Sequence, residues 1–292
     1  MRSFPQFTHS FASFQCFRPG FPYTVLEHLR RNCGLLPRHA TADICCGTGA
    51  FSQLLAANGY RVIGVEANDT LRAIAEKRVG RYGSFQTLKG SAERTRLADQ
   101  SVDFVSIAHR FDQLSIEHAR AEFQRILRPA GSVLLLLNAP KLEGSDFMTA
   151  LQLLYGRFRC DRGNSGRASC FQSSTERLLQ STDYSIAAFD NTQRLSFEQF
   201  RGLLLSESIF PEPQHERFFD LLDAIDELYA RFESDNTIAL ELETTVVHKQ
   251  LEAPQSRTRA TRVRAPRLRD DDFSSTTMAP IFPREDGEKQ AA

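Results

Sequence analysis

The chain has 292 residues, 41% of them hydrophobic, and its 36 Lys and Arg are balanced by 36 Asp and Glu. This length allows one large domain or two small ones, with enough apolar residues for a sizeable core. A net charge of zero gives the chain no overall basic field that would favour a nucleic-acid partner. No apolar run approaches the ~18 residues that a membrane span requires.

The N-terminal residues 1–14 carry one early Arg and scattered polar residues in place of a continuous apolar segment, so we expect no secretory signal. The six cysteines are thinly spread and none forms a Cys-x-x-Cys pair. This spacing argues against a structural zinc site and against a disulfide framework. We therefore expect reduced thiols, no bound metal and a cytoplasmic location.

Strands and helices are predicted to alternate over residues 42–138. A helix is expected at 24–32, ahead of Gly34, and a second at 69–80, with Asp69 as its N-cap and Gly80 at its end. Helical spacing also occurs at 50–60 and from Ser115 onward. Strands are expected at 41–46, 61–67, 85–90, 101–109 and 132–138. This alternation specifies βαβ units and an open, mostly parallel sheet.

The second half of the chain has a different pattern, with helices predicted around 172–180, 196–206 and 214–232. A long β-type run at 236–251 follows them, and the short segment 184–189 is a possible partner strand for it. The composition shifts at about Leu251. Six arginines fall within 257–269 and three aspartates follow, which predicts a disordered tail over 252–292.

The stretch "ADICCGTGAF", residues 42–51, places a Gly-x-Gly turn between a predicted strand and a predicted helix. Glycine permits a tight turn and close approach of a ligand to the backbone, and the helix start offers free N–H groups. Glu66 ends the next strand, nineteen residues after Gly47, where a carboxylate can accept hydrogen bonds from two ribose hydroxyls. The spacing predicts a nucleoside-containing ligand at the carboxyl ends of both strands.

Two ligand classes fit such a turn. A dinucleotide favours a third glycine, but Ser52 stands at that position and the bulky Phe51 precedes it. S-adenosylmethionine has no phosphate, and a two-glycine loop preceded by the acidic Asp43 suits it better. A Tyr-x-x-x-Lys pair is also absent, which further disfavours an NAD(P)-dependent oxidoreductase.

These residues resemble the first motif of class I S-adenosylmethionine-dependent methyltransferases, which commonly reads D-x-G-C-G-T-G after an apolar strand. Cys45 stands where the family usually has glycine. "GSAERTRLADQSVDFVSIAHRFDQL" and "AEFQRILRPAGSVLLLLN" resemble the family's acidic loop, its fourth strand and the turn before its fifth, which here is Arg128-Pro129-Ala130-Gly131. "FRPGFP" and "SFEQFRGLLLSES" resemble segments of the small-molecule branch, similar to methyltransferase type 11. The resemblance covers roughly residues 14–250.

The resemblance implies an α/β fold: a Rossmann-like, doubly wound, mostly parallel seven-stranded sheet with an antiparallel last strand and a helical lid. It implies one methyltransferase domain over 1–251, with a cofactor half at about 14–140 and the lid and last strands at about 141–251. The expected cofactor is S-adenosylmethionine and the expected partner a small-molecule acceptor. Neither a membrane nor a nucleic acid is expected as partner, and no oligomeric state is predicted.

The same resemblance assigns roles around the cofactor. The glycine loop, with Asp43 and Cys45, would hold the methionine part, and Glu66 would take the ribose hydroxyls. Arg18 is either a contact of the cofactor carboxylate or an ordinary surface arginine. The expected cofactor-binding residues are Arg18, Asp43, Cys45, Gly47, Thr48, Gly49, Glu66, Ala67, Asn68, Ser91, Ala92, Glu93, His109, Arg110 and Phe111.

Methyl transfer is an in-line displacement in which positioning supplies much of the acceleration and no covalent nucleophile is needed. The candidates for a general base are His109 and Asp112, and related sequences often carry a histidine at the Asp112 position. His109 could equally be a hydrogen-bonded histidine beneath the cofactor. Cys45 and Cys46 are interpreted as small strand-end residues, because no basic group in the sequence activates them.

The second half is expected to form a lid over the acceptor. Phe210, Phe218 and Phe219 would either line an aromatic acceptor cavity or pack in the core. Two other functions stay open: a methyltransferase recruited to RNA or protein by the Arg-rich tail, and a cofactor-binding protein without catalysis.

Overall fold

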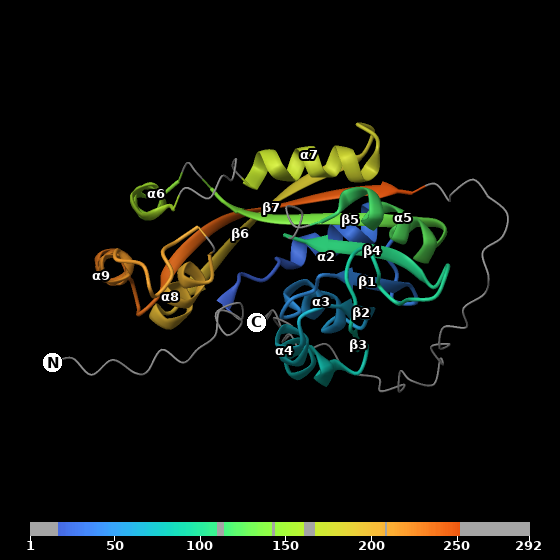
Figure 1. The fold of residues 1–292 in the computed structure, drawn as a ribbon, viewed down its shortest axis with the longest axis horizontal. Helices are drawn as coiled ribbons and strands as arrows, with labels where there is room; N and C mark the ends of the chain where they lie inside the picture. Colours follow the sequence, from blue (N-terminus) through green and yellow to red (C-terminus); the bar gives the residue numbers. More distant parts are fainter. Residues whose placement is uncertain (1–16, 110–113, 142–143, 161–166, 208, 252–292) are drawn as a thin grey trace, which may run out of the picture.

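The computed structural model describes residues 17–109, 114–141, 144–160, 167–207 and 209–251, and all structural statements below concern these ranges. A single seven-stranded sheet runs through them (Figure 1), with strand order β3-β2-β1-β4-β5-β7-β6. The strands are β1 Ala40–Ile44, β2 Arg61–Val65, β3 Phe85–Leu88, β4 Val102–Ala108, β5 Leu127–Pro140, β6 Ser185–Leu195 and β7 Ile238–Gln250. The helices are α2 Tyr23–Asn32, α3 Ala50–Ala56, α4 Asp69–Val79, the 3₁₀ turn η2 Gly80–Tyr82, α5 Ile116–Ile126, α6 Asp146–Phe158, α7 Arg167–Leu179, α8 Phe197–Leu205 and α9 Phe218–Phe232.

The pairing of the strands confirms the predicted doubly wound fold. β1 pairs in parallel with β2 and with β4, β2 pairs in parallel with β3, and β4 with β5. β7 is antiparallel to both of its neighbours, β5 and β6. The predicted pairing of segment 184–189 with the last strand is therefore also confirmed, within a longer strand β6.

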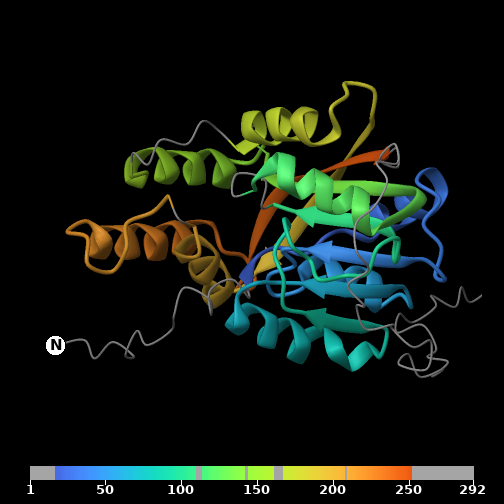
Figure 2. The ribbon, with the colours of Figure 1, turned by 45° about the vertical axis from the view of Figure 1, so that its right-hand side comes forward.

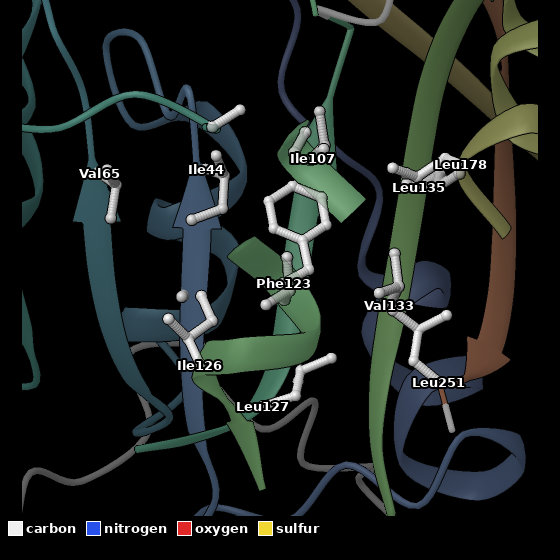
Figure 3. Packing of buried hydrophobic residues seen from close by; sticks show 14 of the residues in the cluster. Ile44, Val65, Ile107, Phe123, Ile126, Leu127, Val133, Leu135, Leu178 and Leu251 are labelled. Carbon is white, nitrogen blue, oxygen red and sulfur yellow. The ribbon is translucent and has the colours of Figure 1, made fainter. Parts of the chain in front are cut away.

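Alternate residues of the central strands enter two different cores, because successive side chains of a strand point to opposite faces. One face is covered by α5 and α7, and Figure 3 shows Phe123 of α5 among Ile44, Ile107 and Ile126. The other face is covered by α2, α3 and α4. Burial on both faces explains why the run at 133–137 is apolar at every position.

A third apolar cluster joins α6, α8 and α9 with the ends of β6 and β7, and we call these three helices the lobe. Figure 2 shows the lobe beyond one end of the sheet. Chain connections identify that end: α6 follows β5 and α8 follows β6, so the lobe lies at the carboxyl edge of the parallel strands. The lobe contains the helices predicted around 196–206 and 214–232, whereas the helix predicted around 172–180 is α7, which packs on a face of the sheet.

Two local predictions from the sequence are wrong, and one helix was missed. Asn68, not Asp69, caps α4, because its side chain accepts hydrogen bonds from the N–H groups of Thr70 and Leu71. Helix α6 was not predicted, although its apolar residues follow helical spacing. The turn predicted at 128–131 lies inside β5, where Ala130 has a φ of 66° and the register with β4 shifts. Val102 pairs with Leu127 and Phe104 with Ser132, so an irregularity of pairing within β5 stands where a turn before the strand was expected.

The Arg-rich tail predicted at 252–292 lies outside the described residues. Within the described ranges, no helix combines the length and the apolar character that crossing a bilayer would take.

Candidate active site at the carboxyl edge of the sheet

The loop between β1 and α3 turns through left-handed backbone at three positions. Cys45, Gly47 and Gly49 have φ values of 54°, 59° and 79°. A Cβ at Gly49 would lie 2.8 Å from Val79 of α4, so the missing side chain lets α3 pack closely on α4. A Cβ at Gly47 would meet nothing within 4 Å, so this residue faces open space. The loop thus exposes backbone at the point where the sequence predicts a ligand.

Asp43 lies beneath this loop and is 1% exposed. Its carboxylate accepts hydrogen bonds from the hydroxyls of Ser52, at 2.6 Å, and Ser106, at 3.0 Å. Burial raises the pKa of Asp43 to about 6, and the negative charge of Glu66 adds to that rise, whereas the bonds from Ser52 and Ser106 oppose it. Asp43 therefore fixes the first turn of α3 to β1 and β4 and does not itself face the open side of the loop.

Glu66 joins the end of β2 to the glycine loop. Its Oε2 accepts a hydrogen bond from the Gly47 N–H at 3.0 Å, and its Oε1 accepts one from the Asn68 N–H at 2.9 Å. A carboxylate oxygen has two acceptor positions, so each oxygen keeps one for a further donor. The side chain is 8% exposed and held at both oxygens, and it is therefore oriented before any ligand binds.

The other residues predicted near the adenine lie beside these groups. Ala67 and Asn68 follow β2 and are exposed, although the Asn68 side chain is occupied in capping α4. Ser91 forms an isolated bridge with Arg94, and the methyl group of Ala92 is buried in the core. Glu93 accepts a hydrogen bond from the Ser115 N–H at 3.1 Å, which ties this loop to the start of α5.

His109 stands at the end of β4 in left-handed backbone, with a φ of 71°. Its N–H donates to the Leu136 carbonyl at 3.0 Å, so the residue is held against β5. Its ring lies 5.6 Å from the ring of Phe21, which in turn contacts Phe51 of α3 at 5.3 Å, edge to face. The predicted site residues Arg110, Phe111 and Asp112 lie outside the described residues.

Residues 17–22, which we call the strap, carry Arg18 and Phe21 to this edge of the sheet. Asn138 of β5, together with Asn191 and Gln193 of β6, donates hydrogen bonds to the Gly20 carbonyl of the strap. The sequence prediction missed these three residues, as it missed Ser52 and Ser106. For Asn138 and Ser106 the signal available was a polar residue inside or at the end of an otherwise apolar strand. Ser52 lies in α3, and Asn191 and Gln193 lie in a polar stretch of β6, so no such signal marks them.

The neighbouring cysteines and the lobe phenylalanines do not add chemistry to the site. Burial raises the pKa of the Cys46 thiol well above its ordinary value, with smaller contributions from the charges of Asp43 and Glu66, so it is a poor nucleophile. Phe210 packs on Tyr155 inside the lobe, with ring centroids 4.9 Å apart, whereas Phe219 is 63% exposed. In the described part of the chain, no group of three His, Cys, Asp or Glu side chains is placed to hold a metal ion.

Comparison with known proteins gives concordant matches. Residues 42–135, which span β1 to the middle of β5, match the family model described as "Methyltransferase domain". An uncharacterised methyltransferase-like protein of Schizosaccharomyces pombe is 23% identical over 249 residues, covering 82% of this chain and 93% of the relative.

Two further matches differ in what they cover. The 2-phytyl-1,4-naphtoquinone methyltransferase of Thermosynechococcus vestitus is 34% identical over 106 residues, which are 35% of this chain and 47% of that protein. The solved structure described as a "Putative Type II Methyltransferase from Anaeromyxobacter dehalogenans" superimposes with a TM-score of 0.54 at 16% identity. It covers 80% of this chain and 97% of its own, and it supports the fold.

Proposed function

Because residues 42–135 form a class I, S-adenosylmethionine-dependent methyltransferase domain, we propose that the chain transfers a methyl group to a small-molecule acceptor by in-line displacement. The family match and the relatives confirm the resemblance found in the motifs, and with it the enzyme class and the cofactor. We propose, in addition, the class of acceptor, the in-line mechanism and the roles of individual residues.

The hydrogen bond between Gly47 and Glu66 carries the proposal, because it places an oriented carboxylate next to a loop with open space above it. Gly47, Thr48 and Gly49 hold the methionine part, with Cys45 at the start of the loop and Asp43 supporting it from below. Glu66 accepts the ribose hydroxyls at its two remaining acceptor positions. Ala67, Asn68 and the loop Ser91–Ala92–Glu93 border the adenine.

S-adenosylmethionine, when bound, supplies the methyl group, which leaves its sulfur as it bonds to the acceptor. The work of the protein is to fix the two reactants in line and to keep water away from them. Phe21, Phe51 and His109 form an aromatic group at the carboxyl end of β4 that suits both tasks. His109 is the general-base candidate among the described residues, for acceptors that must lose a proton.

A small-molecule acceptor is supported by the relative that the chain matches over 35% of its length, whose name gives a phytyl naphthoquinone as its substrate. The position of the lobe also supports it, because α6, α8 and α9 stand at the edge of the sheet where the glycine loop and Glu66 lie. We also propose that residues 1–251 form one methyltransferase domain, and this is supported by β6 and β7, which complete the sheet that β1–β5 begin.

The direct test is calorimetric titration with S-adenosylhomocysteine and, separately, with NADH. We expect micromolar binding of the first and none of the second. Glu66→Gln should weaken the binding of S-adenosylhomocysteine by roughly tenfold or more, since it removes a charged acceptor of hydrogen bonds. Glu216→Gln, at an exposed glutamate that precedes α9, is the matched control. Binding of NADH alone would overturn the proposal.

A further inference from the structure

The strap, residues 17–22, crosses from the lobe to the sheet. At one end, the ring of Phe17 lies where a Cβ on Gly202 of α8 would be, so the absence of a side chain at Gly202 makes room for it. At the other end, Phe21 is buried in the core under α3 and contacts Phe51 and His109. The strap therefore connects the lobe with the end of β4.

Between these ends, both backbone groups of Gly20 are held by side chains of the sheet. The Gly20 carbonyl accepts hydrogen bonds from Asn138 at 3.0 Å, Asn191 at 3.0 Å and Gln193 at 2.9 Å. The Gly20 N–H donates to Oε1 of Gln193 at 3.3 Å. Gln193 thus binds the strap at two points, much as a neighbouring strand would.

The side chains that hold the strap are themselves oriented by one another. Thr244 donates to Oδ1 of Asn138 at 2.5 Å, and Asn191 donates to the same oxygen at 3.3 Å. Gln193 donates to Oδ1 of Asn191 at 3.0 Å. Asn138, Asn191 and Thr244 are 5%, 4% and 0% exposed. Buried amides that lose a partner carry a free-energy cost, so this network favours the docked strap even without a ligand.

The position of the strap relative to the site determines which part of the cofactor it would affect. Phe21 contacts α3 directly after the glycine loop, and it contacts His109 at the end of β4. In the proposed function, the glycine loop before α3 holds the methionine part, and His109 lies on the same side of the site. Glu66 and the adenine-bordering loop lie on the other side, at β2 and β3.

We propose that Asn138, Asn191 and Gln193 are positioning residues for the amino-acid end of the cofactor. They act through the strap, which places Phe21 as a wall beside the methyl group. This inference rests on the proposed function, since it concerns the same cofactor.

The test compares Gln193→Leu with Thr192→Leu. Gln193 is half-buried, so its loss should leave the protein folded, and the exposed Thr192 points to the opposite face of the same strand. Two probes are titrated by calorimetry: S-adenosylhomocysteine, and 5′-methylthioadenosine, which lacks the amino-acid end. Hydrogen exchange of the Gly20 and Phe21 amides is measured without ligand.

In Gln193→Leu, we expect affinity for S-adenosylhomocysteine to fall by about tenfold. Affinity for 5′-methylthioadenosine should stay within about twofold, and exchange at Gly20 and Phe21 should rise. Thr192→Leu should change none of these. If Gln193→Leu proves unfolded by circular dichroism, Asn191→Ala is compared in the same way.

Equal losses for both probes would reduce the network to a structural role and overturn the inference. Unchanged affinity for S-adenosylhomocysteine, with faster exchange of the strap, would overturn it as well. Both outcomes leave the proposed function standing, because the wild-type protein still binds. A wild-type protein that binds neither probe would instead overturn the proposed function, and this inference with it.

Discussion

Glu66 at the end of β2 and Gly47 in the loop after β1 are joined by a hydrogen bond of 3.0 Å between the carboxylate and the backbone N–H. This bond links the two sequence features that are nineteen residues apart and that define the site. It also means that the carboxylate has a fixed orientation in the unliganded protein, so its binding geometry needs little reorganisation.

Gly47→Ala is expected to weaken S-adenosylhomocysteine binding by about tenfold or more. The added methyl group would stand in the open space above the loop, and a left-handed residue other than glycine costs about 1 kcal/mol of stability. Gly59→Ala is the matched control, because Gly59 has a φ of 80° and equally open surroundings but lies in the turn after α3, away from the loop. The two variants should lose similar stability in urea unfolding. Equal ligand affinity in both would contradict the prediction.

Cys45→Gly should raise the free energy of unfolding by about 1 kcal/mol. Cys45 has a φ of 54°, in the region where only glycine has no Cβ penalty, and the family usually has glycine at this position. Cys45→Ala keeps the Cβ and should leave the stability near that of the wild type. Urea unfolding of the three proteins checks this, and a gain for Ala equal to that for Gly would show that the thiol, not the backbone, is responsible.

The carboxyl group of Asp43 should make stability fall as the pH rises through about 6. Its pKa is raised by burial from an ordinary 3.8 to about 6, so the folded protein binds a proton that the unfolded chain has lost. The contribution of Asp43 to the free energy of unfolding is full below pH 3.8 and is lost above pH 6. Relative to Asp43→Asn, the wild type should be more stable at pH 4 than at pH 7.5 by as much as roughly 3 kcal/mol. Parallel pH profiles for the two proteins would contradict this.

His248 and His28 should have the opposite effect on stability. Burial lowers the pKa of both imidazoles, and the charge of His28 lowers that of His248 further, so the unfolded chain binds more protons below pH 6.5. Their contribution is present above pH 6.5 and decreases as the pH falls below it.

His248→Gln should therefore lose less melting temperature than the wild type when the pH falls from 7.5 to 5.5. The melting temperatures of the two proteins are compared at each pH, so that the effect of Asp43, which both contain, cancels. The exposed His215→Gln is the control and should follow the wild type. If the melting temperature of His248→Gln fell with pH as steeply as that of the wild type, the imidazole of His248 would titrate alike in the folded and unfolded states, which would contradict the prediction.

The candidate site could be predicted from the sequence where its residues lie close to one another along the chain. The glycine loop and Glu66 belong to one βαβ unit, so the alternation of strands and helices places them at neighbouring strand ends. The role of Asp43 could not be predicted in this way. Its partners Ser52 and Ser106 come from α3 and β4, and only the packed sheet shows that they bury the carboxylate.

The sequence by itself determined the order of the central strands and helices and the motif at their carboxyl edge, because both follow from local periodicity and short-range spacing. Helix α6 escaped prediction although Ser145 and Asp146 mark its start, and the irregular pairing near Ala130 escaped because it depends on the register with β4. Only the tertiary structure showed that Asn138, Asn191 and Gln193 converge on Gly20. These contacts join residues 118 to 173 positions apart, and no local preference encodes them. They form only when β7 and β6 have joined the sheet beside β5 and the strap packs on these strands.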